Sequence, residues 1–203
     1  MTTTNATTRD ARDDWRRFDA GVIPSKDSTP HLDAFLDVAV ARGQGTPLGI
    51  LDVGCGSGRL SRRLFDRGCS VLGVDINAEA IRAAQELAVP PDAAGRSLRF
   101  AVADVAGDDP PHIDGGPFDL VVCQLVISII GTPRNRANLL RFARENLRPG
   151  GRLFLSASGV SDSINAGYAK LYADDFPLTG ERHTYLSRNA RGEVLYMTHH
   201  FTA

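Results

Sequence analysis

The sequence predicts an α/β fold, with a doubly wound, mostly parallel sheet and helices on both of its faces. Three observations predict this class. Short apolar runs rich in Val, Ile and Leu alternate with amphipathic helical patterns along residues 48–156. The stretches between these runs are long enough for the crossover connections that parallel strands require. The first apolar run ends in the glycine-rich segment 54–58, which is typical of a tight turn after a strand.

Two helices are expected before the first strand. Residues 9–20 have the pattern of a short helix, with Trp15 and Phe18 three positions apart. These two aromatic side chains either dock on the body of the domain or form a flap over a ligand. Thr29-Pro30 is typical of a helix start, and an amphipathic pattern continues from there to Gly43.

The elements that follow alternate regularly. The expected strands are residues 50–53, 70–74, 98–103, 118–123 and 152–156. The expected helices between them are residues 59–67, residues 77–88 and a long helix that begins at Thr132-Pro133 and ends before Pro149-Gly150-Gly151. Strands and helices at this spacing form a parallel sheet covered on both faces.

The C-terminal part, residues 157–203, is expected to contain a helix over 163–174 and an antiparallel hairpin of 183–188 with 193–201. The hairpin is either the antiparallel pair that ends the sheet or a separate hairpin that covers the substrate. We favour the second alternative, which implies a chain truncated before its last sheet elements. Residues 9–203 are expected to form a single domain after a disordered, Thr-rich tail at residues 1–8.

The composition fits one soluble domain and argues against several classes of function. The chain has 203 residues, of which 42% are hydrophobic and 23% charged, and a formal net charge of −1. Proteins that bind nucleic acid through its phosphates usually have a basic excess, so no nucleic-acid partner is expected. No apolar stretch is long enough for a signal peptide or a membrane span, which favours a cytoplasmic protein without a membrane partner. Arginine greatly outnumbers lysine, as in proteins from GC-rich bacterial genomes.

The three cysteines predict neither a disulfide framework nor a metal site. Cys55, Cys69 and Cys123 are scattered along the chain, and no pair has the two-residue spacing of a zinc site. No metal ligand is therefore assigned.

Three carboxylates at successive strand ends indicate a nucleoside site. Asp52 precedes the glycine turn, Asp75 ends the second strand and Asp104 ends the third. In an open parallel sheet, ligands bind at the carboxyl ends of the strands. Asp75 follows Gly54 at the spacing from which a carboxylate accepts hydrogen bonds from ribose hydroxyls.

The same residues argue against a dinucleotide. The third glycine of a dinucleotide motif would stand at position 59, where this chain has Arg59. Asp52 would repel a pyrophosphate, but its charge suits a ligand with ammonium and sulfonium groups. Ile76 offers an apolar edge for adenine. An NAD-dependent oxidoreductase is therefore disfavoured.

Five segments, in order within residues 48–156, resemble motifs of the class I S-adenosylmethionine-dependent methyltransferases. They are residues 50–58, 71–76, 100–105, 118–124 and 147–153. The resemblance implies S-adenosylmethionine as cofactor, with S-adenosylhomocysteine as product. It also implies a role for each motif residue. The turn that contains Gly54, Cys55, Gly56 and Gly58 would wrap the methionyl part of the cofactor, with Asp52 near its ammonium group. Asp75 would hold the ribose hydroxyls and Asp104 the adenine amino group, Ile76 and Val105 would line the adenine pocket, and Cys123 and Gln124 would lie beside the transferable methyl.

The predicted function is methyl transfer to a small-molecule acceptor at an O, N or C nucleophile, such as a natural-product or metabolic intermediate. Gln124-Leu125-Val126 stands where methyltransferases of nucleic-acid and glutamine nitrogens have Asn/Asp-Pro-Pro-aromatic. The alternative is a protein of the same fold that binds the cofactor without transferring methyl, as a regulator or a non-methylating enzyme. Neither an oligomeric state nor a catalytic residue is assigned. The candidates are the possible bases His183, His199 and His200 and the acceptor-side contacts Tyr172 and Tyr185, all of which are more simply read as surface or packed side chains.

Overall fold

The computed structural model describes residues 11–19, 29–42, 47–160 and 166–202, so the tail predicted at residues 1–8 lies outside it. Five strands form one parallel sheet in the order β3-β2-β1-β4-β5. Their bounds are Gly49–Val53 for β1, Ser70–Asp75 for β2, Leu98–Val102 for β3, Phe118–Gln124 for β4 and Leu147–Ser156 for β5. The strand order reverses direction between β1 and β4, which confirms the predicted doubly wound sheet.

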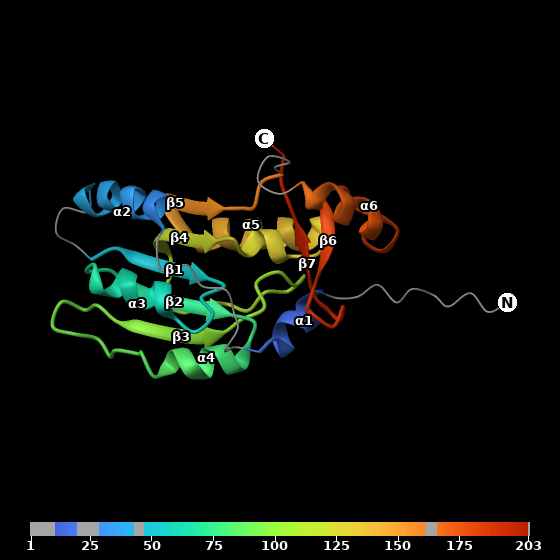
Figure 1. The fold of residues 1–203 in the computed structure, drawn as a ribbon. Coiled ribbons are helices and arrows are strands. Elements are labelled where there is room, and N and C mark those ends of the chain that lie inside the picture. The colour runs from blue at the N-terminus through green and yellow to red at the C-terminus, as the bar shows by residue number, and fades with distance from the viewer. Residues whose placement is uncertain (1–10, 20–28, 43–46, 161–165, 203) are drawn as a thin grey trace.

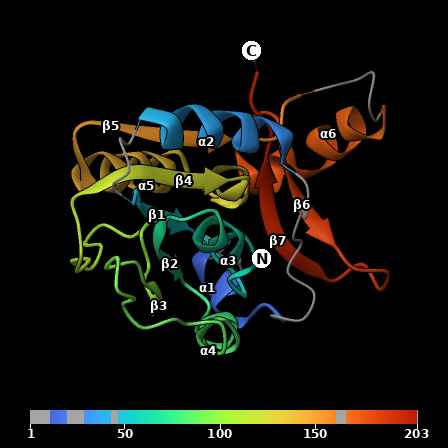
Figure 2. The same ribbon diagram turned by 90° about the vertical axis from the view of Figure 1, so that its left-hand side faces the viewer.

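Helices cover both faces of this sheet (Figure 2). The α-helices are α1 Ala11–Arg17, α2 Pro30–Arg42, α3 Arg59–Asp66, α4 Ala78–Gln85, α5 Pro133–Asn146 and α6 Gly167–Thr179, and η2 is a single turn of 3-10 helix at Val126–Ile129. The apolar residues of α2, α3 and α4 pack on one face, and those of α5 pack on the other. The three central strands β1, β2 and β4 are thus buried on both sides, which is why their sequences are nearly continuous apolar runs, whereas the edge strands β3 and β5 are partly exposed.

Alternate residues of β1 belong to the two opposite cores. Ile50 packs in the cluster that contains Leu36 of α2 and Leu64 of α3. Leu51 packs in the cluster that contains Leu139 and Phe142 of α5. The period of two along a strand therefore decides which face of the sheet each side chain joins.

Side-chain caps set the starts of two helices where the sequence predicts them. The Asn77 side chain accepts hydrogen bonds from the backbone N–H groups of Glu79 and Ala80, at 3.0 and 2.9 Å. The Thr132 hydroxyl accepts one from the Asn135 N–H at 3.1 Å, and Pro133 occupies the first turn. Both arrangements satisfy N–H groups that have no partner inside the helix.

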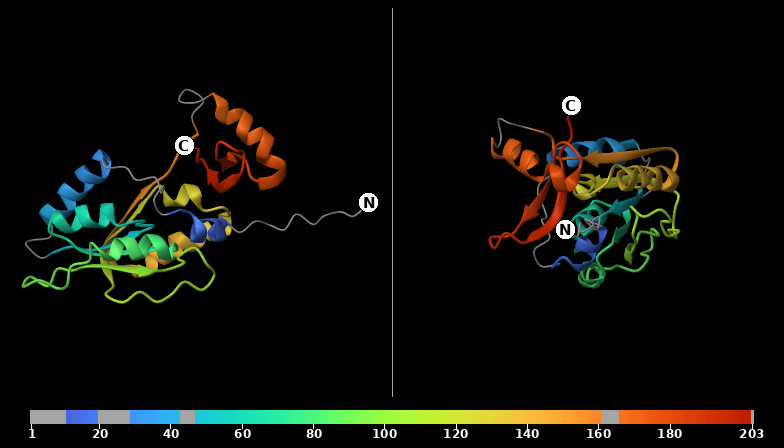
Figure 3. Two further views of the ribbon diagram at one scale, coloured as in Figure 1. Left: turned by 60° about the horizontal axis from the view of Figure 1, so that its bottom comes forward. Right: turned by 90° about the vertical axis from the view of Figure 1, so that its right-hand side faces the viewer.

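The C-terminal strands form a sheet of their own. β6 (Thr184–Arg188) and β7 (Val194–His199) pair antiparallel and do not join the parallel sheet. They lie with α6 and α1 beyond the carboxyl ends of the parallel strands, on the right in Figure 1 and apart from the sheet in Figure 3. The predicted hairpin is confirmed. The alternative in which it extends the main sheet does not hold for the described residues.

Several predicted boundaries are wrong. β5 begins at Leu147 rather than at residue 152, because Leu147 already pairs with Phe118 before a register shift in the ladder. α4 ends at Gln85 rather than near residue 88. α6 runs to Thr179 rather than to residue 174, because it is Gly180, in the left-handed conformation, that terminates the helix. The start predicted for α6 at residue 163 lies outside the described residues.

Candidate functional site

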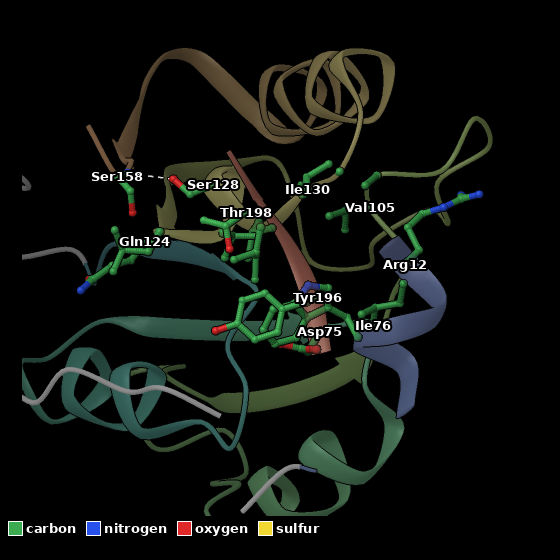
Figure 4. Close-up of a pocket in the computed structure, with 18 of the residues that line it drawn as sticks. Arg12, Asp75, Ile76, Val105, Gln124, Ser128, Ile130, Ser158, Tyr196 and Thr198 are labelled. Atoms are coloured by element: carbon green, nitrogen blue, oxygen red, sulfur yellow. Dashed lines mark hydrogen bonds between the residues drawn. The ribbon is translucent and has the colours of Figure 1, made fainter. Parts of the chain in front are cut away.

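A cavity of about 350 Å³ lies at the carboxyl ends of β1, β2, β3 and β4 (Figure 4). The strand ends and the following loops form one side. The other side, here called the roof, consists of α1, α6 and the β6–β7 hairpin with His200. The cavity is thus at the switch point of the sheet, where the sequence predicts the ligand.

Six of the eleven residues predicted to bind the cofactor line this cavity. They are Gly54, Asp75, Ile76, Asp104, Val105 and Gln124. The other five lie behind the lining: Asp52, Cys55, Gly56, Gly58 and Cys123. The role expected for each residue toward the cofactor stays a prediction.

Asp75 is held at the end of β2 by main-chain groups. Its Oδ2 accepts a hydrogen bond from the Gly56 N–H at 2.9 Å, and its Oδ1 accepts one from the Asn77 N–H at 2.8 Å. Burial raises the pKa of the Asp75 carboxyl, and the hydrogen bonds partly oppose that rise. The carboxylate therefore joins the glycine turn to the start of α4 and faces the cavity from there.

Asp52 lies beneath the glycine turn and is only 1% exposed. Its Oδ2 accepts a hydrogen bond from the Ser61 hydroxyl of α3 at 2.6 Å. Burial raises the pKa of Asp52 to about 6, while the Ser61 hydrogen bond lowers it and the charge of Asp75 adds to the rise. Because Asp52 points to the sheet face that α3 covers, it supports the turn from behind.

Close approaches explain two glycines of the turn. Gly54 has φ +72°, and a Cβ there would overlap Val126 of η2. Gly58 has φ +82°, and a Cβ would lie 2.8 Å from the Phe100 ring. A side chain at either position would therefore be strained as well as crowded.

Asp104 is engaged by α1. Its Oδ2 accepts hydrogen bonds from Arg16 Nη2 at 2.5 Å and from Arg12 Nη1 at 3.4 Å. Its Oδ1 accepts one from the Ala106 N–H at 3.2 Å. Arg12 also lines the cavity, so the first helix brings positive charge to the end of β3.

Trp15 docks on the body of the domain, which is the first of the two alternatives that the sequence leaves open for α1. Its ring packs on Tyr196 of β7, with centroids 4.6 Å apart, and on Phe18 at 4.8 Å. The Asn77 side chain donates to the carbonyl oxygens of Trp15 and Phe18, at 3.0 and 2.8 Å. Trp15 lines the cavity as well, so α1 is docked on the domain and forms part of the cavity wall, while its role as a flap over a ligand stays a prediction.

The part of the roof formed by α6 and the β6–β7 hairpin presents an aromatic, uncharged wall to the cavity. Tyr168, Tyr185, Tyr196 and His200 line it together with Thr198. Burial raises the pKa of Tyr185 to about 12, so its phenol stays protonated in neutral solution. Among the residues that the structure describes, the other predicted acceptor-side candidates, which are Tyr172, His183 and His199, do not reach the lining.

The cysteines are free and buried. Burial raises the pKa of Cys123 to about 12 and that of Cys55 well above its ordinary value, so both stay thiols at neutral pH. Within the described ranges there is no group of three or more His, Cys, Asp or Glu side chains placed to hold a metal ion. No helix in those ranges is long and apolar enough to span a membrane.

Sequence reasoning missed the loop after β4. Leu125 has φ +62°, an unusual value for a leucine, and it begins the short turn η2. Leu125, Val126 and Ser128 all line the cavity. Ser128 accepts a hydrogen bond from the Ser158 N–H at 2.7 Å, which joins this loop to the end of β5. The apolar run gave no signal of a turn, because a four-residue 3-10 segment looks like a continuing strand.

Comparisons with known proteins match this chain to methyltransferases. A family model described as a methyltransferase domain matches residues 51–153. A ubiquinone biosynthesis O-methyltransferase of Leptothrix cholodnii is 30% identical over 109 residues, covering 54% of this chain and 43% of that protein. The mitochondrial ubiquinone biosynthesis O-methyltransferase of Schizosaccharomyces pombe is 32% identical over 144 residues, covering 70% of this chain and 50% of that protein. The chain thus spans at most about half the length of these curated relatives.

A solved structure resembles more of the chain than the family model covers. The crystal structure of a SAM-dependent methyltransferase from Methanosarcina mazei is 31% identical to this chain and superposes with a TM-score of 0.72. The match covers 87% of this chain and 80% of that one. A match of this extent reaches beyond the sheet that the family model covers.

Proposed function

The chain belongs to the class I S-adenosylmethionine-dependent methyltransferases, and from that premise we propose that it transfers a methyl group to a small molecule bound under the roof. The observation that carries this proposal is a single cavity with two different sides. Carboxylates at strand ends form one side, and an aromatic wall forms the other. The first side suits a nucleoside and the second suits an acceptor.

The residues present fit S-adenosylmethionine. Asp75 and Asp104 would hold the ribose hydroxyls and the adenine amino group, and Ile76 would pack on the adenine ring. Gln124 Oε1 is buried at the cavity and has no hydrogen-bond partner among the described residues. An acceptor atom left unsatisfied in this way is costly unless a ligand donates to it, and the methionyl ammonium group is a suitable donor.

The protein's contribution is alignment and exclusion of water. When bound, S-adenosylmethionine supplies a methyl group already activated by the sulfonium charge. The chain then has to hold an acceptor atom in line with the reacting bond, which contributes roughly 7–11 kcal/mol in favourable cases. Trp15 and Tyr196, whose rings pack against each other across the roof, would keep water from that position.

The acceptor side supports a small, uncharged molecule. The charged side chains that line the cavity, which are Arg12, Asp75 and Asp104, all come from α1 or the strand ends. Within the roof, α6 and the β6–β7 hairpin with His200 contribute only aromatic and neutral polar groups toward an acceptor. The O-methyltransferase relatives support a small-molecule substrate, and the net charge of −1 does not favour nucleic acid.

The test is methyl transfer from methyl-labelled S-adenosylmethionine to a panel of small phenols, amines and thiols. We expect label in at least one product and formation of S-adenosylhomocysteine in equal amount. Calorimetry should show binding of S-adenosylhomocysteine and none of NAD. Tight cofactor binding with no labelled product across the panel would instead favour the alternative of a protein that binds without transferring methyl.

A further inference from the structure

His200 stands out among the histidines. All five histidines lie in the described ranges, and only His200 lines the cavity. It is 5% exposed, and its backbone N–H donates to the His183 carbonyl oxygen at 2.9 Å. A buried imidazole at a cavity wall is an unusual placement for a group with no structural role there.

The imidazole ring is fixed on several sides. Its Nδ1 is 2.6 Å from the Tyr172 hydroxyl of α6. The rings of Tyr168 and Tyr185 stand nearly perpendicular to it, with centroids 4.7 and 5.4 Å away. The other nitrogen, Nε2, makes no hydrogen bond with any described residue. One ring nitrogen is therefore held by the protein and the other is left to a ligand.

We propose that the acceptor is a hydroxyl compound, in the first place a phenol packed on the tyrosine wall, and that His200 Nε2 accepts its proton. Tyr172 is the positioning residue: its oxygen accepts a hydrogen bond from Nδ1–H, which leaves the lone pair on Nε2. The proposal rests on the proposed methyl transfer and adds the class of acceptor atom and the proton acceptor.

The step balances. As the acceptor oxygen bonds to the methyl carbon, the carbon–sulfur bond breaks and its electron pair goes to sulfur. The hydroxyl proton goes to His200 Nε2, and water removes it from the imidazolium once the product has left. The products are a methyl ether, S-adenosylhomocysteine and one proton.

The surroundings keep His200 neutral and ready to accept a proton. Burial lowers its pKa, and the nearby His183 lowers it further. The other titratable groups around it are Tyr168 and Tyr172 from α6, Tyr185 from β6 and the adjacent His199. His199 also has a hydroxyl at its Nδ1, that of Thr184 at 2.8 Å, but it is less suited to the role because it does not line the cavity.

The kinetic test compares His200→Asn with the wild type on phenol and on 4-nitrophenol, which is largely ionised in mildly alkaline buffer. Asn keeps a polar atom near the Nδ1 position but has nothing at Nε2. With phenol, kcat should fall by about 10² to 10⁴, the usual contribution of a general base. With 4-nitrophenol the loss should be much smaller, because that acceptor needs no base. Equal losses with both phenols would overturn the proposal.

Two further variants separate a positioning role from a folding defect. Tyr172→Phe should lower kcat less than His200→Asn and leave the affinity for S-adenosylhomocysteine unchanged. His112→Asn alters an exposed histidine outside the cavity and should match the wild type in every assay. The wild-type kcat should also rise with pH through the lowered pKa of His200, and His200→Asn should lose that rise.

A measurement that needs no turnover keeps the two proposals apart. ¹⁵N NMR of the histidine rings, with S-adenosylhomocysteine bound, should show His200 protonated at Nδ1 and not at Nε2 in neutral solution. Tyr172→Phe should shift this tautomer balance. A proton on Nε2 would overturn the role of His200 whether or not methyl transfer is found. The correct tautomer in a protein that transfers methyl only to amines or thiols would overturn the hydroxyl acceptor and leave the proposed methyl transfer standing.

Discussion

The two sides of the cavity are built by different kinds of contact. On the strand side, main-chain N–H groups of Gly56 and Asn77 hold Asp75, and the strands themselves are paired along their length. In the roof, side chains far apart in the sequence hold each other, as Trp15 and Tyr196 do. The backbone thus dictates the shape of the first side, whereas single side chains decide whether the second side is closed. Substitutions on the two sides should therefore have separable effects.

The largest expected effect is on the free energy of unfolding and comes from Asp52, which is buried beneath the strand side of the cavity. Asp52→Asn removes a carboxyl whose pKa is raised to about 6 in the folded protein from 3.8. In the unfolded chain this carboxyl ionises at its ordinary pKa, so the wild type loses stability relative to the variant as pH rises from about 4 to above 6. A shift of roughly two pKa units corresponds to about 3 kcal/mol. The free energies of unfolding in urea at pH 4, 5, 6 and 8 should show this divergence.

The control for this experiment is Asp66→Asn, on the exposed part of α3, whose difference from the wild type should stay nearly constant with pH. If Asp52→Asn and the wild type ran parallel across this range, the buried carboxyl would not be the cause of any pH dependence. The roof should not contribute to this pH dependence, because Asp52 has no contact with it.

Asp75→Ala should have the next largest effect, and this effect should be on the binding of S-adenosylhomocysteine. The carboxylate is expected to accept two charge-assisted hydrogen bonds from the ribose, and the loss of about 2.7 kcal/mol raises the Kd of S-adenosylhomocysteine about 100-fold. Calorimetry measures the Kd directly, and circular dichroism checks that the fold persists. Since Asp75 also shapes the glycine turn, Asp75→Asn is the closer variant: it keeps the size and removes the charge. An unchanged Kd in both variants would remove Asp75 from the ribose site.

Arg188→Met should open the roof without affecting the strand side. Arg188 donates to both carboxylate oxygens of the buried Asp175, at 2.9 and 2.6 Å, and so ties β6 to α6. Its removal leaves Asp175 with the Leu186 N–H as its remaining hydrogen-bond donor, at a cost of about 2 kcal/mol. Hydrogen exchange should become faster in α6 and the hairpin and stay unchanged in β1, β2 and β4.

The matched control is Arg191→Met, in the exposed turn between β6 and β7, which should leave exchange as in the wild type. Faster exchange throughout the sheet in Arg188→Met would mean that the roof and the strands unfold as one unit. The contrast drawn between the two sides would then fail for stability, even if it held for binding.

The contrast between the two sides of the cavity also explains how much of the fold and of the site could be predicted from the sequence. The alternation of strands and helices along the chain, the helix caps and the acidic strand ends follow from local patterns, so Asp75 and Asp104 could be placed at the cavity. Asp52 belongs to the same motifs and yet lies on the sheet face that α3 covers, because successive residues in a strand face opposite sides. Cys123 lies on the other face, buried in the cluster that contains Phe142 of α5. A motif shows that a residue belongs to a site but not which way its side chain points.

The roof could be predicted only in part. The hairpin has a local signature, but the meeting of Trp15 with Tyr196, or of Tyr172 with His200, depends on how separate elements pack. Pairs so distant in sequence leave no periodic pattern to read. The positive φ of Leu125 is also set by tertiary contacts rather than by its residue type.

Substitution of Trp15 should have the smallest effect, and the fluorescence of Trp15 is the most direct probe of the roof. It is the chain's single tryptophan, so its fluorescence reports on this contact alone, and binding of S-adenosylhomocysteine should change its emission. Trp15→Ala should raise the Kd about tenfold, or about 1.4 kcal/mol, because it removes the stacking on Tyr196 and exposes the cavity. Trp15→Phe is the matched variant. Since Trp15 Nε1 is buried without a hydrogen-bond partner among the described residues, Phe removes no such bond and should keep most of the affinity. If Trp15→Ala left both the Kd and the rate of cofactor release unchanged, α1 would be docked on the domain without closing the site.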